Sequence, residues 1–392
     1  MVVAVLAGSA HADPQLVPIT PGTSYAIDLY DGVTLGNSAV VAMGGATVAN
    51  AAGSSGTLAN PSAPAVRNTT DTDTWSWDYH LDFLDATRSR DFANTGLNGV
   101  ADHGARMFTG GVAVRVHDWA GAITASTQTV DVGQITLPSG AMPQLAATTL
   151  RGRFAMAHWF PSRDISFGLG AQLASFSIVP DCATSECTAL FTIQGIGLEA
   201  GAQYIPRWES WRLGASVSSA IIGGNVVANN CDPNDCNGLV LPSEVRSPWR
   251  FAVGGAYRFA DTDWNQVVGG NFRDEPAVTV TADLVVSGPT ADGYGLDAFA
   301  QNQLERSGSN TVLSLRGGAE YEWLPGRLRV RGGSYWEPGR FDGVSGRIHG
   351  TFGIEVRVFD FQLWGQRRGR ITLTGDLAHR YNNVAVSIGF WH

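Results

Sequence analysis

The chain has 392 residues, of which 44% are hydrophobic, 10% are aromatic and only 16% are charged. A disordered chain would be poorer in aromatic residues and richer in charge, so this composition excludes disorder. The formal net charge is -9, and the 26 basic residues, all arginines, form no cluster interleaved with aromatic residues. These features exclude a nucleic-acid-binding surface.

Residues 1 to 12 read MVVAVLAGSAHA, a short apolar run that ends in the small-residue pattern Ala10-His11-Ala12. This pattern is typical of a signal peptide with its cleavage site, although the usual positive charges at the start are missing. The alternative interpretation is a buried first strand. We expect a signal peptide remnant and therefore an exported protein.

Residues 35 to 66 contain no charged residue and are rich in Gly, Ser and Ala. Flexible linkers have a similar composition. However, Val40, Val41, Val48 and Leu58 give the segment more apolar surface than a solvated linker needs. We therefore expect this segment to be buried.

From residue 74 onward, apolar and polar residues alternate with a period of two, which is typical of strands with one apolar face. Between residues 347 and 358, for example, Ile348 and Phe352 fall on one face while His349 and Glu355 fall on the other. No run approaches the roughly 20 apolar residues that a membrane-spanning helix requires. The alternation predicts fourteen strands, at residues 74–86, 104–118, 120–129, 146–160, 164–178, 188–204, 210–223, 249–260, 276–287, 310–323, 326–336, 346–358, 361–376 and 383–391.

The lengths of these strands and of their connections favour a transmembrane antiparallel β-barrel over a soluble exported β-protein. A tilted membrane strand needs about 9 to 11 residues, whereas strands of soluble sheets average about 5 to 6. Long and short connections alternate along the chain, and the number of strands is even, as in single-chain bacterial outer-membrane barrels. The exceptions are the stretch at 261–275, which is long for a periplasmic turn, and the final outer loop near Tyr381 to Asn383, which is short. Aromatic residues near strand ends, such as Trp249, Phe259, Trp323 and Trp336, fit girdles at the two membrane interfaces.

The four cysteines form two local pairs, Cys182 with Cys187 and Cys231 with Cys236, each inside a polar loop. Pairs of this kind favour small disulfide-closed loops in an oxidising compartment, which agrees with export. A zinc site is the alternative, but no histidine lies beside either pair.

The N-terminal segment resembles the hatch of FadL-type transporters of long-chain fatty acids and other hydrophobic compounds. The resemblance rests on Gly36, Ser38 and the run Met43-Gly44-Gly45-Ala46, followed by Gly56 and by Asn60-Pro61-Ser62-Ala63. The last stretch resembles the Asn-Pro-Ala motif at the end of that hatch, with Ser62 where the family usually has alanine. Residues 315–321 and 328–335 resemble the late hairpin of the same family.

This resemblance implies a monomeric barrel of about fourteen strands whose lumen is plugged by the N-terminal segment. The expected domains are a signal peptide remnant at 1–12, a hatch at 13–73 and the barrel at 74–392. The family binds an apolar ligand, such as a fatty acid, a hydrocarbon or a detergent-like molecule, and lets it pass without energy input through an opening in the wall toward the membrane lipids. No cofactor, nucleotide or metal is implied. Candidate gate residues are Gly44, Gly45, Gly56, Asn60 and Pro61, and candidate ligand-binding residues, which would face either the ligand or the wall, are Val41, Met43, Val48 and Leu58.

Three other functions fit the same pattern. A general aqueous porin would share the alternation and the aromatic residues, although it needs no apolar N-terminal plug. A purely structural barrel or adhesin would carry its function in the outer loops. An outer-membrane enzyme would use Asp78, His80 and Asp82, because an Asp/His set on one polar face activates water as a general base.

The alternative interpretation of Asp78, His80 and Asp82 is a polar lumen wall that hydrogen-bonds to the hatch. No G-x-S-x-G or H-E-x-x-H motif supports the enzyme. A second set of charged residues predicts an internal ladder of salt bridges and hydrogen bonds, or else a positive strip for a carboxylate headgroup. This set comprises His349, the arginines at 316, 327, 329, 331, 347 and 357, and Glu320, Glu322 and Glu355.

Overall fold

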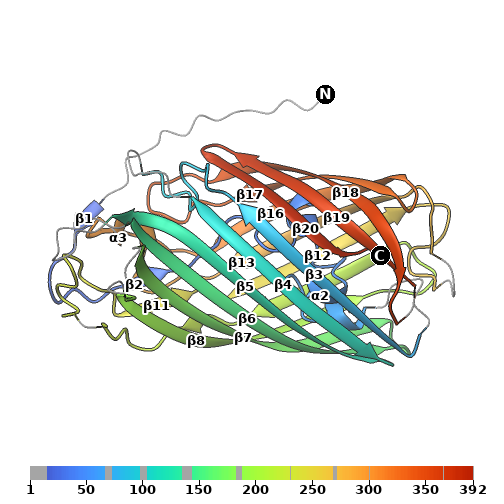
Figure 1. Cartoon of the computed structure of the whole chain (residues 1–392), viewed down its shortest axis with the longest axis horizontal. Coiled ribbons are helices and arrows are strands. Elements are labelled where there is room, and N and C mark those ends of the chain that lie inside the picture. The colour runs from blue at the N-terminus through green and yellow to red at the C-terminus, as the bar shows by residue number, and fades with distance from the viewer. Residues whose placement is uncertain are drawn as a thin grey trace.

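The computed structural model describes residues 16–66, 73–97, 104–134, 144–181, 188–229, 231–267, 272–299, 301–364 and 366–391. Fourteen antiparallel strands form a closed barrel, which confirms the predicted fold class (Figure 1). The ladder closes where the last strand pairs with the first, with Val384 opposite Asp85. The barrel strands are β3 (Trp75–Asp85), β4 (Ala105–Val116), β5 (Trp119–Gln134), β6 (Gln144–Phe160), β7 (Ile165–Asp181), β8 (Phe191–Tyr204), β9 (Trp211–Ser218), β12 (Arg250–Phe259), β13 (Val278–Ser287), β16 (Val312–Leu324), β17 (Leu328–Glu337), β18 (Arg347–Gln362), β19 (Gln366–Ala378) and β20 (Tyr381–Phe390).

The two faces of the strands are those that the alternation predicts. On β18, Ile348 and Phe352 are exposed on the outer surface, whereas His349 and Glu355 are buried inside the barrel. Exposed tryptophans such as Trp119 stand at the strand ends. An apolar outer band with aromatic borders is the surface that a lipid bilayer requires of a barrel.

Most strand boundaries differ from the sequence prediction by one to five residues, and those of β18 and β9 show why. β18 continues to Gln362 rather than ending at residue 358, because a bulge between Arg357 and Phe359 turns Val358 and Phe359 to the same outer surface and breaks the alternation. β9 ends at Ser218 rather than at residue 223. The chain leaves the wall there, and the next residues pair elsewhere.

Most short connections and both ends of the barrel domain lie at one end, here called the turn end, and most long connections lie at the other, the loop end. The exceptions are the long connection between β12 and β13, at the turn end, and the two-residue connection between β19 and β20, at the loop end. Small strands occupy the loop end, and the sequence did not predict them. β1 (Leu16–Pro18) pairs with β15 (Gln303–Glu305), and β2 (Ala26–Asp28) lies parallel between β11 (Glu244–Ser247) and β14 (Gly293–Tyr294). β10 (Ile221–Ile222) pairs with β11, and a short helix, α3 (Leu296–Phe299), precedes β15.

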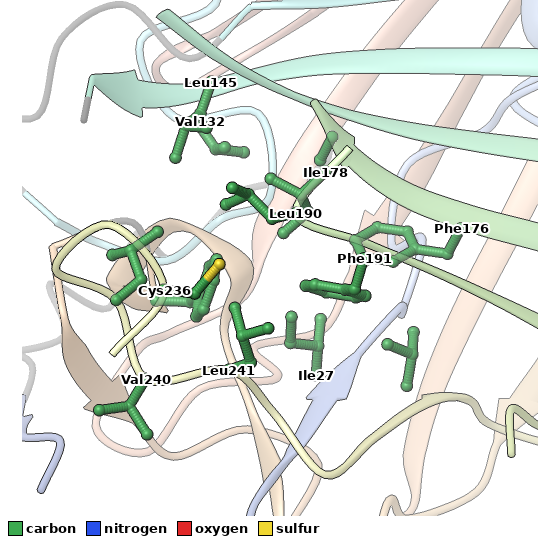
Figure 2. Packing of buried hydrophobic residues seen from close by; sticks show 14 of the residues in the cluster. Ile27, Val132, Leu145, Phe176, Ile178, Leu190, Phe191, Cys236, Val240 and Leu241 are labelled. Carbon is green, nitrogen blue, oxygen red and sulfur yellow. The ribbon is translucent and has the colours of Figure 1, made fainter. Parts of the chain in front are cut away.

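These loop-end elements share one apolar core with the ends of the barrel strands (Figure 2). Ile27 of β2 packs in it together with Phe176, Ile178 and Phe191 of the wall. The buried Cys236 belongs to the same core and forms a disulfide with Cys231, as the sequence predicts. The predicted partners Cys182 and Cys187 lie outside the described residues.

Residues 33–66, here called the inner segment, lie inside the barrel. They contain α1 (Ser38–Ala42), α2 (Gly53–Gly56) and a 3-10 helix, η1 (Ala63–Ala65). The first helix contacts β3 and β17–β20, the second contacts β3–β5, and the last contacts β4–β7. A segment that touches the wall on opposite sides occupies the lumen, and Figure 1 shows α2 enclosed by barrel strands.

Glu305 is the most unusual group of the loop end. It is buried on β15, and neither carboxylate oxygen has a hydrogen-bond partner among the described residues. Burial, with smaller contributions from Asp297 and Asp91, raises the pKa of Glu305 to about 9. The folded chain therefore keeps this proton between pH 4.5 and about 9 while the unfolded chain releases it, so folding stability decreases as the pH rises through that range.

We expect Glu305→Gln, which is uncharged at every pH, to raise the thermal midpoint of the purified protein at pH 8 by a few degrees and to leave it nearly unchanged at pH 4.5. Thermal unfolding in detergent at the two pH values measures this difference. Glu244→Gln is the control, because Glu244 is paired with Arg246 at the same end of the barrel. An equal increase in the thermal midpoint of Glu305→Gln at both pH values would contradict the raised pKa of Glu305.

Candidate functional site

The wall holds the inner segment through inward-facing carboxylates of β3. The backbone N–H of Ser38 donates to Asp82 at 3.0 Å, and the side-chain amide of Asn37 donates to the same carboxylate. Ser54 donates both its backbone N–H, at 2.7 Å, and its hydroxyl to Asp78. Buried carboxylates are stable when they accept such hydrogen bonds, and charge-assisted bonds of this kind are stronger than neutral ones.

His80 lies between these two carboxylates and is completely buried. Its Nδ1 is 2.9 Å from the hydroxyl of Ser54, and its Nε2 is 3.9 Å from Asp82. Asp78, His80 and Asp82 thus come together against the inner segment. This geometry is that of a polar wall that hydrogen-bonds to the N-terminal segment, which the sequence predicts as the alternative to an enzyme site.

A third carboxylate and the candidate gate residue Asn60 hold the middle of the inner segment. Asp283, on β13, accepts the backbone N–H of Val48 at 2.9 Å. The side-chain amide of Asn60 lies 3.1 to 3.3 Å from the carbonyl oxygens of Val48, Ala202 and Ala215, the last two on β8 and β9. Asn60 therefore ties two parts of the inner segment to the wall at one point.

The wall carries glycine where the inner segment touches it most closely. A Cβ atom at Gly168, Gly201 or Gly214, on three adjacent strands, would overlap atoms of Pro61, Asn60 or Val48. The overlapped atoms of Pro61 and Val48 are backbone atoms, which cannot rotate away. Glycine at these positions allows direct contact between two backbones.

The predicted gate and ligand residues occupy different surroundings. Gly44 and Gly45 follow α1 with φ angles of 62° and 73°, which favour glycine, whereas Gly56 has no positive φ and packs against Ala63. Val41 packs in an apolar cluster with the wall, and the backbone of Met43 lies against wall glycines. Of the four predicted ligand-binding residues, Val48 and Leu58 line a cavity between the inner segment and the wall, and Val41 and Met43 are not part of its lining.

That cavity, here called the inner cavity, lies between the inner segment and the wall and has a volume of about 130 Å³. Its apolar lining includes Val33, Leu35, Val40 and Met107 besides Val48 and Leu58. A smaller cavity of about 60 Å³, the outer cavity, lies among the loop-end residues. The two cavities share Asp31, Gln128, Thr149 and Arg151 in their linings, so they adjoin one another.

Four arginines also line the inner cavity. Arg151 forms an ion pair with Asp31, and Arg153 lies 3.7 Å from Glu199. Arg250 and Arg316 form no ion pair with a carboxylate in the part of the chain that the structure describes. The inner cavity therefore combines an apolar side, from the inner segment, with a positively charged side, from the wall.

The wall beside the inner cavity has an incomplete backbone ladder. β8 pairs with β7 from Phe191 to Tyr204, but on its other side it pairs with β9 only from Glu199 to Tyr204. From Thr192 to Gly197, β8 forms no backbone ladder on that side with any described residue. We call this stretch the seam. Glu199 and Ser218, which form the last pair below the seam, both line the inner cavity.

Side-chain packing covers the seam. Ile221 of β10 is buried and lies where Cβ atoms at Gly195 and Gly197 would stand. Ile222 of β10 and Ile196 of β8 are both exposed. Packing of a two-residue strand against glycines is weaker than a hydrogen-bonded ladder, and the backbone ladder of β10 is with β11 rather than with β8.

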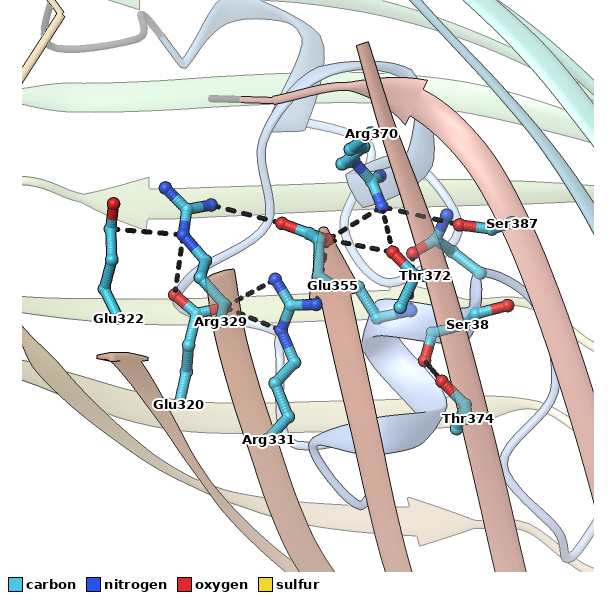
Figure 3. Close-up of polar contacts among 12 residues, drawn as sticks. Ser38, Glu320, Glu322, Arg329, Arg331, Glu355, Arg370, Thr372, Thr374 and Ser387 are labelled. Carbon is cyan, nitrogen blue, oxygen red and sulfur yellow. Dashed lines mark hydrogen bonds and ion pairs between the residues drawn. The ribbon is translucent and has the colours of Figure 1, made fainter. Parts of the chain in front are cut away.

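The predicted ladder of ion pairs is present across β16 to β19 (Figure 3). Glu355 is its centre and accepts hydrogen bonds from Arg331 at 2.8 Å and from Arg370 at 2.9 Å. Arg329 connects Glu355 to Glu322, and Arg331 also binds Glu320. These charges satisfy one another inside the barrel.

The remaining residues of that prediction divide into two groups. His349 and Arg347 belong to a second buried cluster, in which His349 lies 2.7 Å from Glu337 and 2.8 Å from Asp376, and Arg347 also binds Glu337. Three of the predicted arginines do not belong to the ladder. Arg327 is exposed in the turn between β16 and β17, Arg316 donates to Ser314, and Arg357 pairs with Asp360.

Comparisons with solved structures identify the fold. The toluene transporter TbuX of Ralstonia pickettii matches with a TM-score of 0.54 at 13% identity, over 90% of this chain and 97% of TbuX. The CymD monoaromatic hydrocarbon channel matches with a TM-score of 0.52 at 12% identity, over 91% of this chain and 96% of CymD. A deltaS2S3 mutant of the TodX monoaromatic hydrocarbon channel matches with a TM-score of 0.56 at 13% identity, over 92% and 99%. No protein-family model and no curated protein matches the sequence. The chain thus has the fold of the FadL-type channels, as its resemblance to them predicts.

Proposed function

We propose that this chain is an outer-membrane channel for the passive uptake of hydrophobic compounds and that the inner segment is its hatch. The observation that carries this proposal is the inner cavity, which lies between an apolar side of the inner segment and the wall. The loop end would face the outside, because the long loops of bacterial barrels are extracellular. The closed barrel supplies a complete lumen by itself, which supports a monomer.

The adjoining cavities define a path for such a ligand. A hydrophobic molecule would enter the outer cavity, which is lined by Phe92, Phe176 and Phe341, and would pass Arg151 into the inner cavity. A hydrophobic solute is unfavourably solvated in a water-filled pore. Adjoining apolar cavities would let it cross without returning to water. No energy source is needed for movement down a gradient.

The seam is the exit that we propose for the ligand. It borders the inner cavity at Glu199 and Ser218, and its outer surface carries the exposed side chains Ile196, Leu198 and Ile222. A ligand that displaces β10 would move sideways from the cavity into the hydrocarbon region of the membrane. This route needs no opening of the turn end.

The volume of the inner cavity favours a ligand the size of a single aromatic ring. An apolar cavity of roughly 150 Å³ accommodates benzene, and the inner cavity measures about 130 Å³. The structural neighbours TbuX and CymD are named as a toluene transporter and a monoaromatic hydrocarbon channel. A long-chain fatty acid is the second candidate, because Arg250 and Arg316 in the same lining would attract its carboxylate.

Mass spectrometry of an organic extract of the detergent-purified protein tests the proposal. We expect the intact protein to retain toluene or a fatty acid after incubation and washing, and we expect Asn60→Ala and a deletion of residues 35–60 to retain much less. The identity of the retained molecule separates the two ligand candidates. If nothing apolar is retained and the intact protein conducts ions steadily in planar bilayers, the protein is a general aqueous porin.

A further inference from the structure

A third cavity lies at the turn end of the barrel, below the inner segment, and has a volume of about 450 Å³. We call it the turn-end chamber. Asn50, Gly53 and Pro64 of the inner segment form part of its upper lining. Trp264 and Phe272, from the connection between β12 and β13, line it from the other side. This connection is the one whose length is unusual for a periplasmic turn, and its residues Trp264 and Phe272 reach into the mouth of the barrel.

The turn-end chamber is positively charged although the chain as a whole is acidic. Its lining contains eight arginines and five carboxylate residues, whereas the whole chain has 26 basic and 35 acidic residues. Several of the arginines are neutralised locally: Arg368 binds Asp274 through two hydrogen bonds, and Arg329 and Arg331 belong to the ladder around Glu355. The excess of positive charge lies elsewhere in the chamber.

That excess lies around Arg212 of β9. Arg212 is buried and forms no ion pair with a carboxylate among the described residues. The charged groups that act on it are Arg258 and Arg273, both positive. Within the described part of the chain, Arg258 forms an ion pair with Glu275 alone, at 3.1 Å, and Arg273 faces Glu275 and the exposed Asp263. Three guanidinium groups thus converge beside one half-buried carboxylate, Glu275, because Glu322, which also acts on Arg258, is paired with Arg329. Buried charge without compensation is unfavourable.

The guanidinium of Arg212 is held in a fixed orientation. Its Nε donates to Asn265 at 2.8 Å, and its flat face lies 3.9 Å from the centre of the Trp264 ring. Asn265 is itself fixed by two hydrogen bonds to backbone carbonyls, those of Pro206 and Trp211. In the described part of the chain, the two terminal nitrogens of Arg212 have no partner, so a fork that suits an oxyanion remains available.

We propose that the turn-end chamber binds a small oxyanion, a carboxylate or a phosphate, at Arg212 and Arg258. The ligand would enter from the turn end, and its negative charge would neutralise the cluster that Glu275 alone leaves positive. The site is separate from the inner cavity and shares none of its lining residues. The proposal therefore does not depend on the proposed uptake of hydrophobic compounds.

Isothermal titration calorimetry on the detergent-purified full chain tests the site with three probes: sodium benzoate, inorganic phosphate and the uncharged benzyl alcohol. We expect at least one of the two anions to bind with an affinity that weakens as salt is added, and we expect no binding of benzyl alcohol in the chamber. Binding of benzoate alone identifies a carboxylate site, and binding of phosphate alone identifies a phosphate site. If neither anion binds at millimolar concentration, the proposal is wrong.

Arg212→Gln removes the charge but keeps a side-chain amide, and we expect it to weaken anion binding at least tenfold. Arg163→Gln is the matched control, because Arg163 is exposed at the same end of the barrel and does not line the chamber. Migration of unheated samples in gel electrophoresis reports folding of each variant. If Arg212→Gln does not fold, Arg258→Gln takes its place. Equal affinity in a folded chamber variant and in the control would overturn the assignment.

Trp264 provides a second readout that a purely structural role of Arg212 would not change. An anion that engages Arg212 alters the environment of the indole stacked on it, so benzoate or phosphate should change the tryptophan fluorescence of the intact protein. In Trp264→Phe this signal should disappear while calorimetric binding persists. A signal of unchanged size in Trp264→Phe would show that the anion does not bind at Arg212, beside Trp264.

Discussion

Replacing Gly214 with valine should displace the inner segment and raise the ionic conductance of the purified barrel in planar bilayers by at least about tenfold. A side chain at this position of β9 would occupy the place of the Val48 carbonyl oxygen and of the backbone next to it. The wall cannot yield, because β9 is hydrogen-bonded to β8 and β12 on its two sides. The inner segment must therefore move, and a barrel of fourteen strands has a lumen too wide for its own side chains to close.

Gly152→Val is the control for this experiment. Gly152 lies within β6, and a Cβ atom there would meet no other atom within 4 Å. The control should fold, remain closed and retain the apolar ligand. If folded Gly214→Val shows the conductance of the unmodified protein, the inner segment does not close the lumen.

A disulfide across the seam should abolish the uptake of toluene by cells that depend on this channel, and a reductant should restore it. The pair Gly197→Cys and Ile221→Cys is suitable because a Cβ atom at Gly197 would lie 2.8 Å from the side chain of Ile221, so the two Cβ atoms come within reach of a disulfide. The bond would fix β10 to β8 and close the sideways route. We expect the rate of uptake to fall at least about tenfold, because the remaining routes lead past the hydrogen-bonded inner segment.

Matched cysteines across a complete ladder provide the control for the seam. Ala125 and Gly152 are opposite one another on β5 and β6, where the two strands pair along their whole length. Cross-linking this pair should leave uptake unchanged, and each single-cysteine variant should respond to reductant like the unmodified protein. Undiminished uptake through a fully oxidised seam would show that the ligand leaves elsewhere.

The barrel could be predicted from the sequence because lipid and lumen impose opposite demands on alternate residues. That demand is strong along β18, where Ile348 and His349 face opposite sides. The prediction of strands fails where the sequence shows no alternation of apolar and polar residues. The two-residue strand β10 is too short to show a period, and the bulge in β18 places two apolar residues on one side.

The contacts that define the site could be predicted less well. The pattern of small residues indicated that residues 35 to 66 are buried, and Asn60 stood out through its motif. Asp283, in contrast, binds a backbone group that is 235 positions away in the sequence, and no local pattern indicates that pairing. The wall glycines could not be predicted as contact sites for the same reason. A glycine adds nothing to an apolar or polar pattern, and the role of Gly201 becomes clear only from the structure, in which Asn60 lies against it.

The course of the N-terminal part constrains the order in which the molecule can assemble. β2 is bonded between β11 and β14 at the loop end, the inner segment then runs down the lumen, and the chain enters β3 from the turn end. A folded sheet cannot be threaded through a finished ring of hydrogen-bonded strands. The pairing of β20 with β3 must therefore form around the inner segment and not before it, so the last step of biogenesis joins residues that are about 300 positions apart. Contacts between residues that are far apart in the sequence form slowly, so we expect the closure of this barrel to be slow.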